Sequence, residues 1–229
     1  MKRKPAKRKP APKRAKRTFA PAAVRAPEIY RRLERAYPDA RCALDYRNPY
    51  ELIVATILSA QCTDKRVNMV TPALFETYPD VERLSAADPE MLQEMIKSTG
   101  FFRNKTKSLL GMSAAVVERH GGTVPSTMAE LVKLPGVGRK TANVVLGNAF
   151  GRDEGVVVDT HVTRLSDRLA LSRESDAVKI EQDLMALFPQ TQWTMLAHLL
   201  ISHGREICDA RRPLCEQCVV NDLCPSSRV

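Results

Sequence analysis

The sequence of 229 residues has no long apolar run. A helix that spans a membrane needs about 18 or more consecutive apolar residues, and no segment approaches this length. No apolar stretch follows the basic opening either, so we expect no secretory signal peptide. The sequence therefore predicts a soluble protein. Its apolar share of 44% is enough to bury a sizeable core in one large or two small domains.

Acidic residues are absent from the first 17 positions, which hold ten Lys and Arg residues. In the rest of the chain 26 basic residues balance 26 acidic ones, so the net charge of +10 belongs to this tail. A Lys/Pro/Ala segment buries little apolar surface, and we expect residues 1–20 to be a disordered basic tail. Such a tail suits a polyanion-binding arm. The alternatives are a solubilising tail or a nuclear-import signal.

Extended segments are nearly absent, because only "GVVVD" (155–159) reads as a strand. The other patterns predict helices, and two of them begin with a cap followed by Pro: Asn48-Pro49 and Asp88-Pro89. The fold class is therefore predicted as all-α. The further helical candidates are 104–122, 126–134, 139–150, 160–172, 176–189 and 191–208.

One stretch, "LPGVGRKTANVVL" (134–146), places two glycines directly before two cations. A nucleotide-binding P-loop does not fit, because Arg139 separates Gly138 from Lys140 and a helix, not a strand, precedes the glycines. We expect Gly136 and Gly138 to leave backbone amides bare at the start of a helix, where they bind a phosphate. Val137 would pack inward. The alternative is an ordinary corner between two helices.

Four of the six cysteines lie within the last 22 residues: Cys208, Cys215, Cys218 and Cys224. In a chain without secretory features this grouping favours a metal site over disulfides. Four thiolates in a compact loop can hold Zn²⁺ or an iron–sulfur cluster, and the spacing alone leaves both open.

The glycine motif, "VDTHV" some twenty residues later and the cysteine cluster together resemble endonuclease III, a family of helix-hairpin-helix DNA glycosylases. The resemblance runs from about residue 27 to 225. It implies two helical lobes with a DNA groove between them. We expect one lobe at 45–150 and the other at 21–44 plus 151–229. It also implies a [4Fe–4S] cluster on the four cysteines, with Arg211 and Arg212 turned toward DNA.

By this resemblance Lys140 matches the catalytic lysine, which attacks C1′ of a damaged nucleotide and forms a Schiff base. The start of a helix disfavours a cation, and we expect partial burial of Lys140 to add to this effect. Asp159 matches the residue that activates the lysine and stabilises charge on the sugar. From its position alone it is a helix N-cap. Adenine-specific relatives keep the Asp but lack the Lys.

The same resemblance implies that further residues help the enzyme to reach a base inside duplex DNA. Gln61 would fill the space left by the extruded nucleotide, and Phe101 would act as a wedge between base steps. From the sequence alone Phe101 is equally a core residue. The proposed phosphate contacts are Arg103, Lys105, Arg139 and the hairpin residues 136–138. Asp64 and His161 would line the pocket.

The resemblance implies a glycosylase and abasic-site lyase that acts on oxidised pyrimidines in duplex DNA. Its rivals are a monofunctional glycosylase and a non-catalytic DNA-binding or redox-sensing protein. We expect the enzyme to work as a monomer in a bacterial cytoplasm, at the nucleoid.

Overall fold

The computed structural model describes residues 18–229, so the expected tail at 1–20 lies outside the described residues except for its last three. The described chain contains helices, turns and loops but no strand, which confirms the all-α prediction. Residues 155–159 form no strand, and Val156, Val157 and Val158 are buried in a loop. Within the described residues, no helix is long and apolar enough to cross a membrane.

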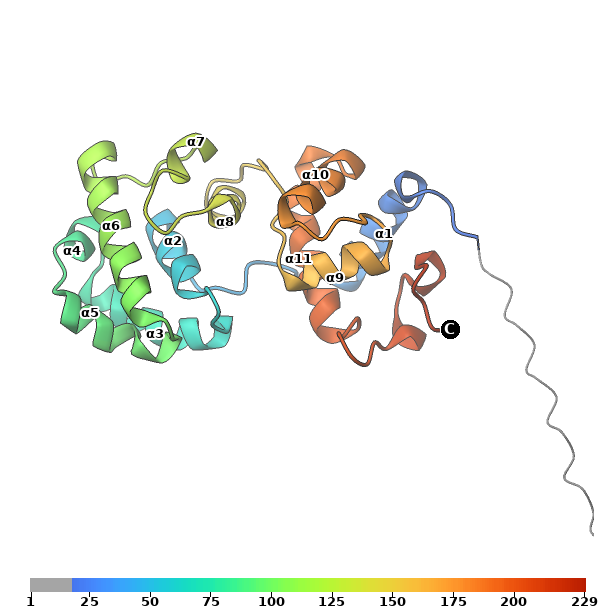
Figure 1. Ribbon diagram of the computed structural model, residues 1–229, viewed down its shortest axis with the longest axis horizontal. Coiled ribbons are helices and arrows are strands. Elements are labelled where there is room, and N and C mark those ends of the chain that lie inside the picture. The colour runs from blue at the N-terminus through green and yellow to red at the C-terminus, as the bar shows by residue number, and fades with distance from the viewer. Residues whose placement is uncertain (1–17) are drawn as a thin grey trace, which may run out of the picture.

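The first lobe is built around a central apolar helix (Figure 1). It contains α2 (Pro49–Leu58), α3 (Asp64–Thr77), α4 (Val81–Ser85), α5 (Pro89–Ile96), α6 (Phe102–His120), α7 (Met128–Leu131) and α8 (Arg139–Ala149), with a 3₁₀ turn η1 (Lys97–Thr99). Helix α2 is apolar nearly all round, and all of its residues except Pro49 and Thr56 are buried. Its side chains therefore form the centre of one hydrophobic core that runs from Leu44 to Leu146.

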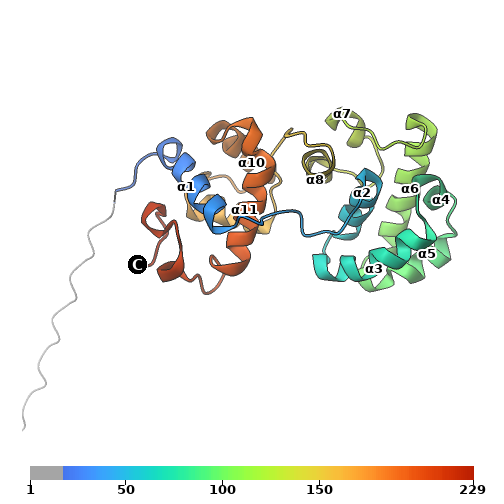
Figure 2. The same ribbon diagram turned by 180° about the vertical axis from the view of Figure 1, so that it is seen from behind.

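The second lobe joins the first helix to the C-terminal part of the chain (Figure 2). It contains α1 (Ala22–Ala36), α9 (Thr160–Arg168), α10 (Ala177–Leu187) and α11 (Trp193–Glu206), with the short turns η2 (Gln190–Gln192), η3 (Cys215–Gln217) and η4 (Asn221–Leu223). A second hydrophobic core unites these elements. The chain crosses between the lobes after α1 and again after α8, and Val144 packs against both cores.

Local capping explains where several helices begin. Asn48 accepts a hydrogen bond from the Glu51 amide at 2.9 Å, and Asp88 accepts one from the Met91 amide at 2.8 Å. Each cap is followed by a proline at the first helical position, where its fixed φ fits and no amide is needed. Both predicted helix starts are therefore confirmed.

Other elements depart from the sequence patterns. The sequence patterns do not indicate helices α3 and α4, because α3 mixes polar with apolar residues and contains Pro72, and α4 has five residues. Met91, in the first turn of α5, is exposed although it is apolar. The η1 turn follows α5, and Gly100 ends it with φ +73°. That conformation is open to glycine at little cost.

Candidate active site and cysteine cavity

Asp159 ends the buried loop 156–158 and begins α9. Its Oδ1 accepts hydrogen bonds from the amides of His161 and Val162, both at 2.8 Å. This is the geometry of an N-cap. Its Oδ2 has no bonding partner among the described residues. The capping role expected from position is therefore present, and one carboxylate oxygen remains for other chemistry.

Lys140 and Asp159 line the same cavity, of about 330 Å³, between the two lobes. Helices α2 and α8 contribute residues from one lobe, and α11 contributes residues from the other. Lys140 itself is exposed. The expected partial burial is wrong, because Lys140 is the second residue of α8 and that end of the helix borders open space. The cavity thus places an accessible amine and a carboxylate in one enclosure.

The turn before α8 packs tightly against α6. Gly136 has φ +76°, and a Cβ at this position would lie 2.5 Å from Ser108 Cβ. Gly111 on α6 meets Pro135 in the same way, since a Cβ there would lie 3.0 Å from Pro135 Cβ. Gly138 differs, because its φ is −91° and no atom lies within 4 Å of an added Cβ. Only Gly136 is needed for the fold of the turn.

The first turn of α8 lacks a side-chain cap, unlike α2, α3, α5, α9 and α10. Gly138 occupies the cap position, and its carbonyl accepts from the Ala142 amide at 2.9 Å. The amides of residues 139–141 have no acceptor among the described residues. Bare amides at the positive end of a helix bind anions. This end of α8 can therefore hold a phosphate.

One expected DNA contact in this turn, that of Val137, is wrong, and the Arg139 side chain has a partner within the protein. Val137 is buried in the first core, and its amide donates to the Leu134 carbonyl at 3.1 Å, so it closes the turn. The Arg139 guanidinium forms a two-point ion pair with Glu181 of α10, at 2.8 and 3.0 Å. Glu181 also raises the pKa of Arg139. Arg139 therefore links the two lobes, and no local sequence pattern indicates its partner 42 positions away.

Gln61 and Phe101 share an unusual backbone conformation. Their φ values are +52° and +48°, in the left-handed region that residues other than glycine rarely adopt. Gln61 is exposed and lines the Lys140 cavity. Phe101 is 62% exposed, so it is not a core residue. Both side chains stand at loop tips, where they can reach a partner.

The expected phosphate contact at Lys105 is wrong. Lys105 is 4% exposed, and its Nζ donates to the carbonyls of Leu58 and Thr99, both at 2.8 Å. Burial lowers the pKa of this amine. Arg103, by contrast, is exposed, and its guanidinium lies 5.7 Å from the centre of the Phe102 ring. Arg103 remains available to a phosphate.

Asp64 and His161 lie at a second cavity beside the first. Asp64 lines both cavities, whereas His161 lines only the second. Asp64 forms an ion pair at 2.6 Å with Arg205 of α11, a residue that the sequence patterns did not single out. This pair joins the lobes across the site. The Nδ1 atom of His161 lies 3.1 Å from the Arg164 guanidinium, which only donates, so Nδ1 accepts.

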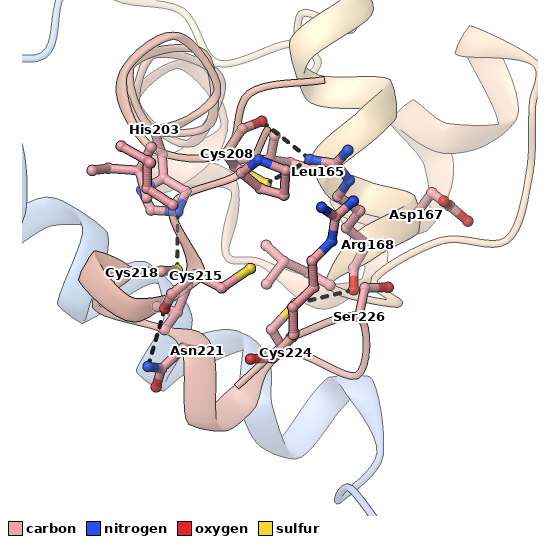
Figure 3. Close-up of a pocket in the computed structure, with 17 residues that line it drawn as sticks. Leu165, Asp167, Arg168, His203, Cys208, Cys215, Cys218, Asn221, Cys224 and Ser226 are labelled. Atoms are coloured by element: carbon pink, nitrogen blue, oxygen red, sulfur yellow. Dashed lines mark hydrogen bonds between the residues drawn. The ribbon is translucent and has the colours of Figure 1, made fainter. Parts of the chain in front are cut away.

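The four C-terminal cysteines surround one cavity of about 270 Å³ (Figure 3). All four are half-buried thiols that form no disulfide. Burial raises the pKa of the Cys218 thiol to about 11. Among the described residues no three Cys, His, Asp or Glu groups lie close enough to hold a single metal ion. Four sulfurs around a space of this size suit a cluster of several atoms better than one ion.

Two side chains that the sequence did not indicate contact these sulfurs (Figure 3). Arg168 donates to Cys208 Sγ at 3.2 Å, and His203 Nε2 lies 3.3 Å from Cys218 Sγ. The other ring nitrogen of His203 lies 2.9 Å from the Tyr37 hydroxyl. Hydrogen bonds of this kind orient cluster ligands and tune their charge. The loop therefore fits an iron–sulfur cluster in its donors and in their surroundings.

Arg211 and Arg212 lie in the loop between the first two cysteines. Their amides donate to Asp209 Oδ1, both at 2.8 Å, which turns the backbone. These bonds also hold the pKa of Asp209 below its ordinary value. Both arginines are exposed, so their guanidinium groups face solvent from the loop.

Two family models match the chain. Residues 54–190 match the HhH-GPD superfamily of base excision DNA repair proteins, and residues 208–224 match the iron–sulfur binding domain of endonuclease III. Endonuclease III of Synechocystis sp. is 54% identical over 212 residues, which cover 93% of this chain and 97% of the relative. Endonuclease III of Bacillus subtilis is 48% identical, over 82% of this chain and 86% of the relative.

Solved structures agree with these sequence matches. A non-covalent complex of endonuclease III with DNA is 40% identical and has a TM-score of 0.85, over 90% of this chain and 96% of that one. A trapped covalent intermediate of endonuclease III with DNA is 40% identical and has a TM-score of 0.86, over 90% of this chain and 97% of that one. The similarity thus includes both lobes and the cysteine loop.

Proposed function

This chain belongs to the endonuclease III family of HhH-GPD base excision repair proteins, and we propose that it removes oxidised pyrimidines from duplex DNA and then cuts the strand at the abasic site. One observation carries the proposal. The amine of Lys140 and the carboxylate of Asp159 line a single cavity where the lobes meet. They supply a nucleophile and a fixed charge beside it.

The reaction begins when the unprotonated Lys140 Nζ attacks C1′ of the damaged nucleotide. The bond from C1′ to the base breaks, and the base leaves with the electron pair and takes up a proton. The attacking nitrogen then passes a proton to O4′, the C1′–O4′ bond breaks, and nitrogen and C1′ form a protonated imine. The protonated imine acidifies the C2′ proton, and loss of this proton breaks the C3′–O bond. Water finally hydrolyses the imine and frees Lys140.

Asp159 supports these steps through the oxygen that does not cap α9. As a carboxylate it accepts a proton from the Lys140 ammonium, and it stabilises the positive charge that develops on the sugar. Lys140 is exposed, so bound DNA must exclude water from the amine.

The DNA backbone would lie across the exposed start of α8, where the bare amides of residues 139–141 bind one phosphate. Gln61 and Phe101 would enter the duplex from the same side, Gln61 opposite the orphaned base and Phe101 between base steps. Arg103, Arg211 and Arg212 are exposed cations suited to further phosphate contacts. Asp64 and His161 would line the approach to the base.

The chain carries a [4Fe–4S] cluster, which Cys208, Cys215, Cys218 and Cys224 would hold. When bound, the cluster crosslinks the C-terminal loop and fixes the backbone that presents Arg211 and Arg212. We assign residues 45–150 to one lobe, and residues 21–44 with 151–229 to the other. A repair enzyme of a bacterial family works where the chromosome lies, so we place this chain in the cytoplasm, at the nucleoid.

The test compares base release with strand cleavage on a duplex that carries one oxidised thymine. The proposal predicts that both products appear together, and that Lys140→Gln loses both while it still binds the duplex. Release of base without strand cleavage would leave a monofunctional glycosylase. Tight binding with neither product would leave a DNA-binding protein.

A further inference from the structure

Lys105 is a buried cation that the proposed reaction does not use. Its residue is 4% exposed, and no carboxylate pairs with its ammonium among the described residues. A buried charge is costly unless its environment compensates it. Two backbone carbonyls provide that compensation, those of Leu58 and Thr99, each 2.8 Å from Nζ. An apolar side chain would fill the same space without this cost.

The two carbonyls lie at the C-terminal ends of helical elements, where they would otherwise lack a hydrogen-bond donor. Leu58 is the last residue of α2, and Thr99 is the last residue of η1. Carbonyls at such ends lack a backbone partner and carry the negative end of the helix dipole. A single ammonium therefore joins the ends of two elements that lie about forty positions apart in the sequence.

Each bonded carbonyl lies two or three positions before a proposed plugging residue. Gln61 follows Leu58 by three positions, and Phe101 follows Thr99 by two. Among the described residues three non-glycine residues have positive φ, and Gln61 and Phe101 are two of them. Such conformations persist only where the surroundings enforce them. The Phe101 carbonyl accepts the first helical bond of α6, from the Lys105 amide at 3.1 Å, so the Phe101 loop leads directly into the helix that carries Lys105.

We propose that Lys105 is a positioning residue that fastens the Gln61 and Phe101 loops to each other, so that both side chains enter the duplex as one rigid unit. The inference rests on the proposed function, since it assigns the geometry of the plugging residues. It also explains why Lys105 is a lysine although its amine does not face solvent. Lys105 would act on DNA only through these two loops.

The test uses Lys105→Met, which keeps the apolar stem and removes the ammonium. Lys179→Met, at an exposed site on α10, is the charge-matched control. Because the two loops would no longer be fastened to each other in Lys105→Met, we expect its kcat for excision from a duplex to fall roughly tenfold to a hundredfold. Strand cleavage at an abasic site in single-stranded DNA needs no plug, so its rate is expected to stay within about twofold of wild type. The control follows wild type in both assays.

A spectroscopic measurement separates positioning from a general loss of structure. 2-Aminopurine opposite the lesion reports whether the orphaned base is contacted, and the expected result for Lys105→Met is the loss of the fluorescence change that wild type gives. Phe101→Ala combined with Lys105→Met is expected to be little worse than either alone, because both act on one step. Additive effects, or an unchanged fluorescence response, would overturn the proposal.

A second variant covers the case in which Lys105→Met does not fold. Lys105→Gln can still donate to one of the carbonyls, and intermediate duplex activity with normal single-strand cleavage is expected. Wild-type duplex activity in this variant, or failure of both variants to fold, would make Lys105 a stability residue only. If wild type neither releases the base from the lesion-bearing duplex nor cuts that duplex, the proposed function fails instead.

Discussion

At the scale of single residues, Asp159 combines two roles on separate oxygen atoms. Oδ1 holds two amides at the start of α9, and Oδ2 has no partner within the described chain. A cap needs an acceptor but no charge, whereas the proposed chemistry needs the negative charge. The two roles can therefore be separated by substitution.

We predict that Asp159→Asn slows base release and strand cleavage on the order of 100-fold, because it removes the charge beside the sugar. Its amide oxygen still caps α9, so the free energy of unfolding is expected to change by less than about 1 kcal/mol. Asp159→Ala, the companion variant, loses the cap as well and is expected to be less stable by about 1 kcal/mol. Urea unfolding and single-turnover kinetics measure both effects. Full activity in Asp159→Asn would contradict the assignment.

At the scale of elements, the start of α8 contains two glycines with different requirements. Gly136 has positive φ and lies against Ser108, whereas Gly138 has an ordinary backbone conformation in open space. The sequence motif alone suggests the same role for both glycines. The structure assigns Gly136 to the packing of the turn and leaves Gly138 beside the bare amides.

We predict that Gly136→Ala destabilises the fold by about 1–3 kcal/mol, through backbone strain and collision with α6. Gly138→Ala is expected to keep its stability within about 0.5 kcal/mol, since nothing opposes the added methyl group. The methyl group would crowd the amides, and DNA binding is expected to weaken about tenfold, as for one lost bond to a charged group. Thermal melts and binding titrations test this pair. Equal stability of both variants, or normal binding by Gly138→Ala, would refute the distinction.

Capped helix starts could be predicted from the sequence because their causes are local. Asn48 and Asp88 each bond an amide three positions away, and the following proline fixes the first turn. The metal or cluster site could be predicted for the same reason, because its four cysteines lie close together in the sequence. The contacts of the Lys105 and Arg139 side chains could not be predicted in this way. Leu58 lies 47 positions from Lys105 and Glu181 lies 42 positions from Arg139, and an exposed basic residue would suit a phosphate contact equally well.

At the scale of the whole molecule, the two lobes are joined by polar contacts beside the site. The Arg139–Glu181 pair links α8 to α10, and Asn143 donates to the same carboxylate at 2.8 Å. Gly155 lies so close that a Cβ there would collide with Glu181. The Asp64–Arg205 pair adds a second link. These contacts fix the relative position of Lys140 and Asp159, which come from different lobes.

We predict that Arg139→Met destabilises the protein by about 2 kcal/mol, because it leaves the buried Glu181 carboxylate with Asn143 as its remaining side-chain donor. Glu181→Gln in the same molecule removes the orphaned charge, so the double variant is expected to regain part of this loss. Urea unfolding of the single and double variants measures the coupling. Simple additivity of the two substitutions would show that the pair does not hold the lobes together.

Borohydride trapping on a duplex with one oxidised thymine tests whether Lys140 is the nucleophile. Borohydride reduces an imine to a stable amine, so it records the bond between Lys140 and C1′. We expect a covalent protein–DNA adduct with the wild-type protein and none with Lys140→Ala, although this variant binds the duplex. An adduct that persists in Lys140→Ala, or no adduct from a wild-type protein that binds tightly, would contradict this expectation.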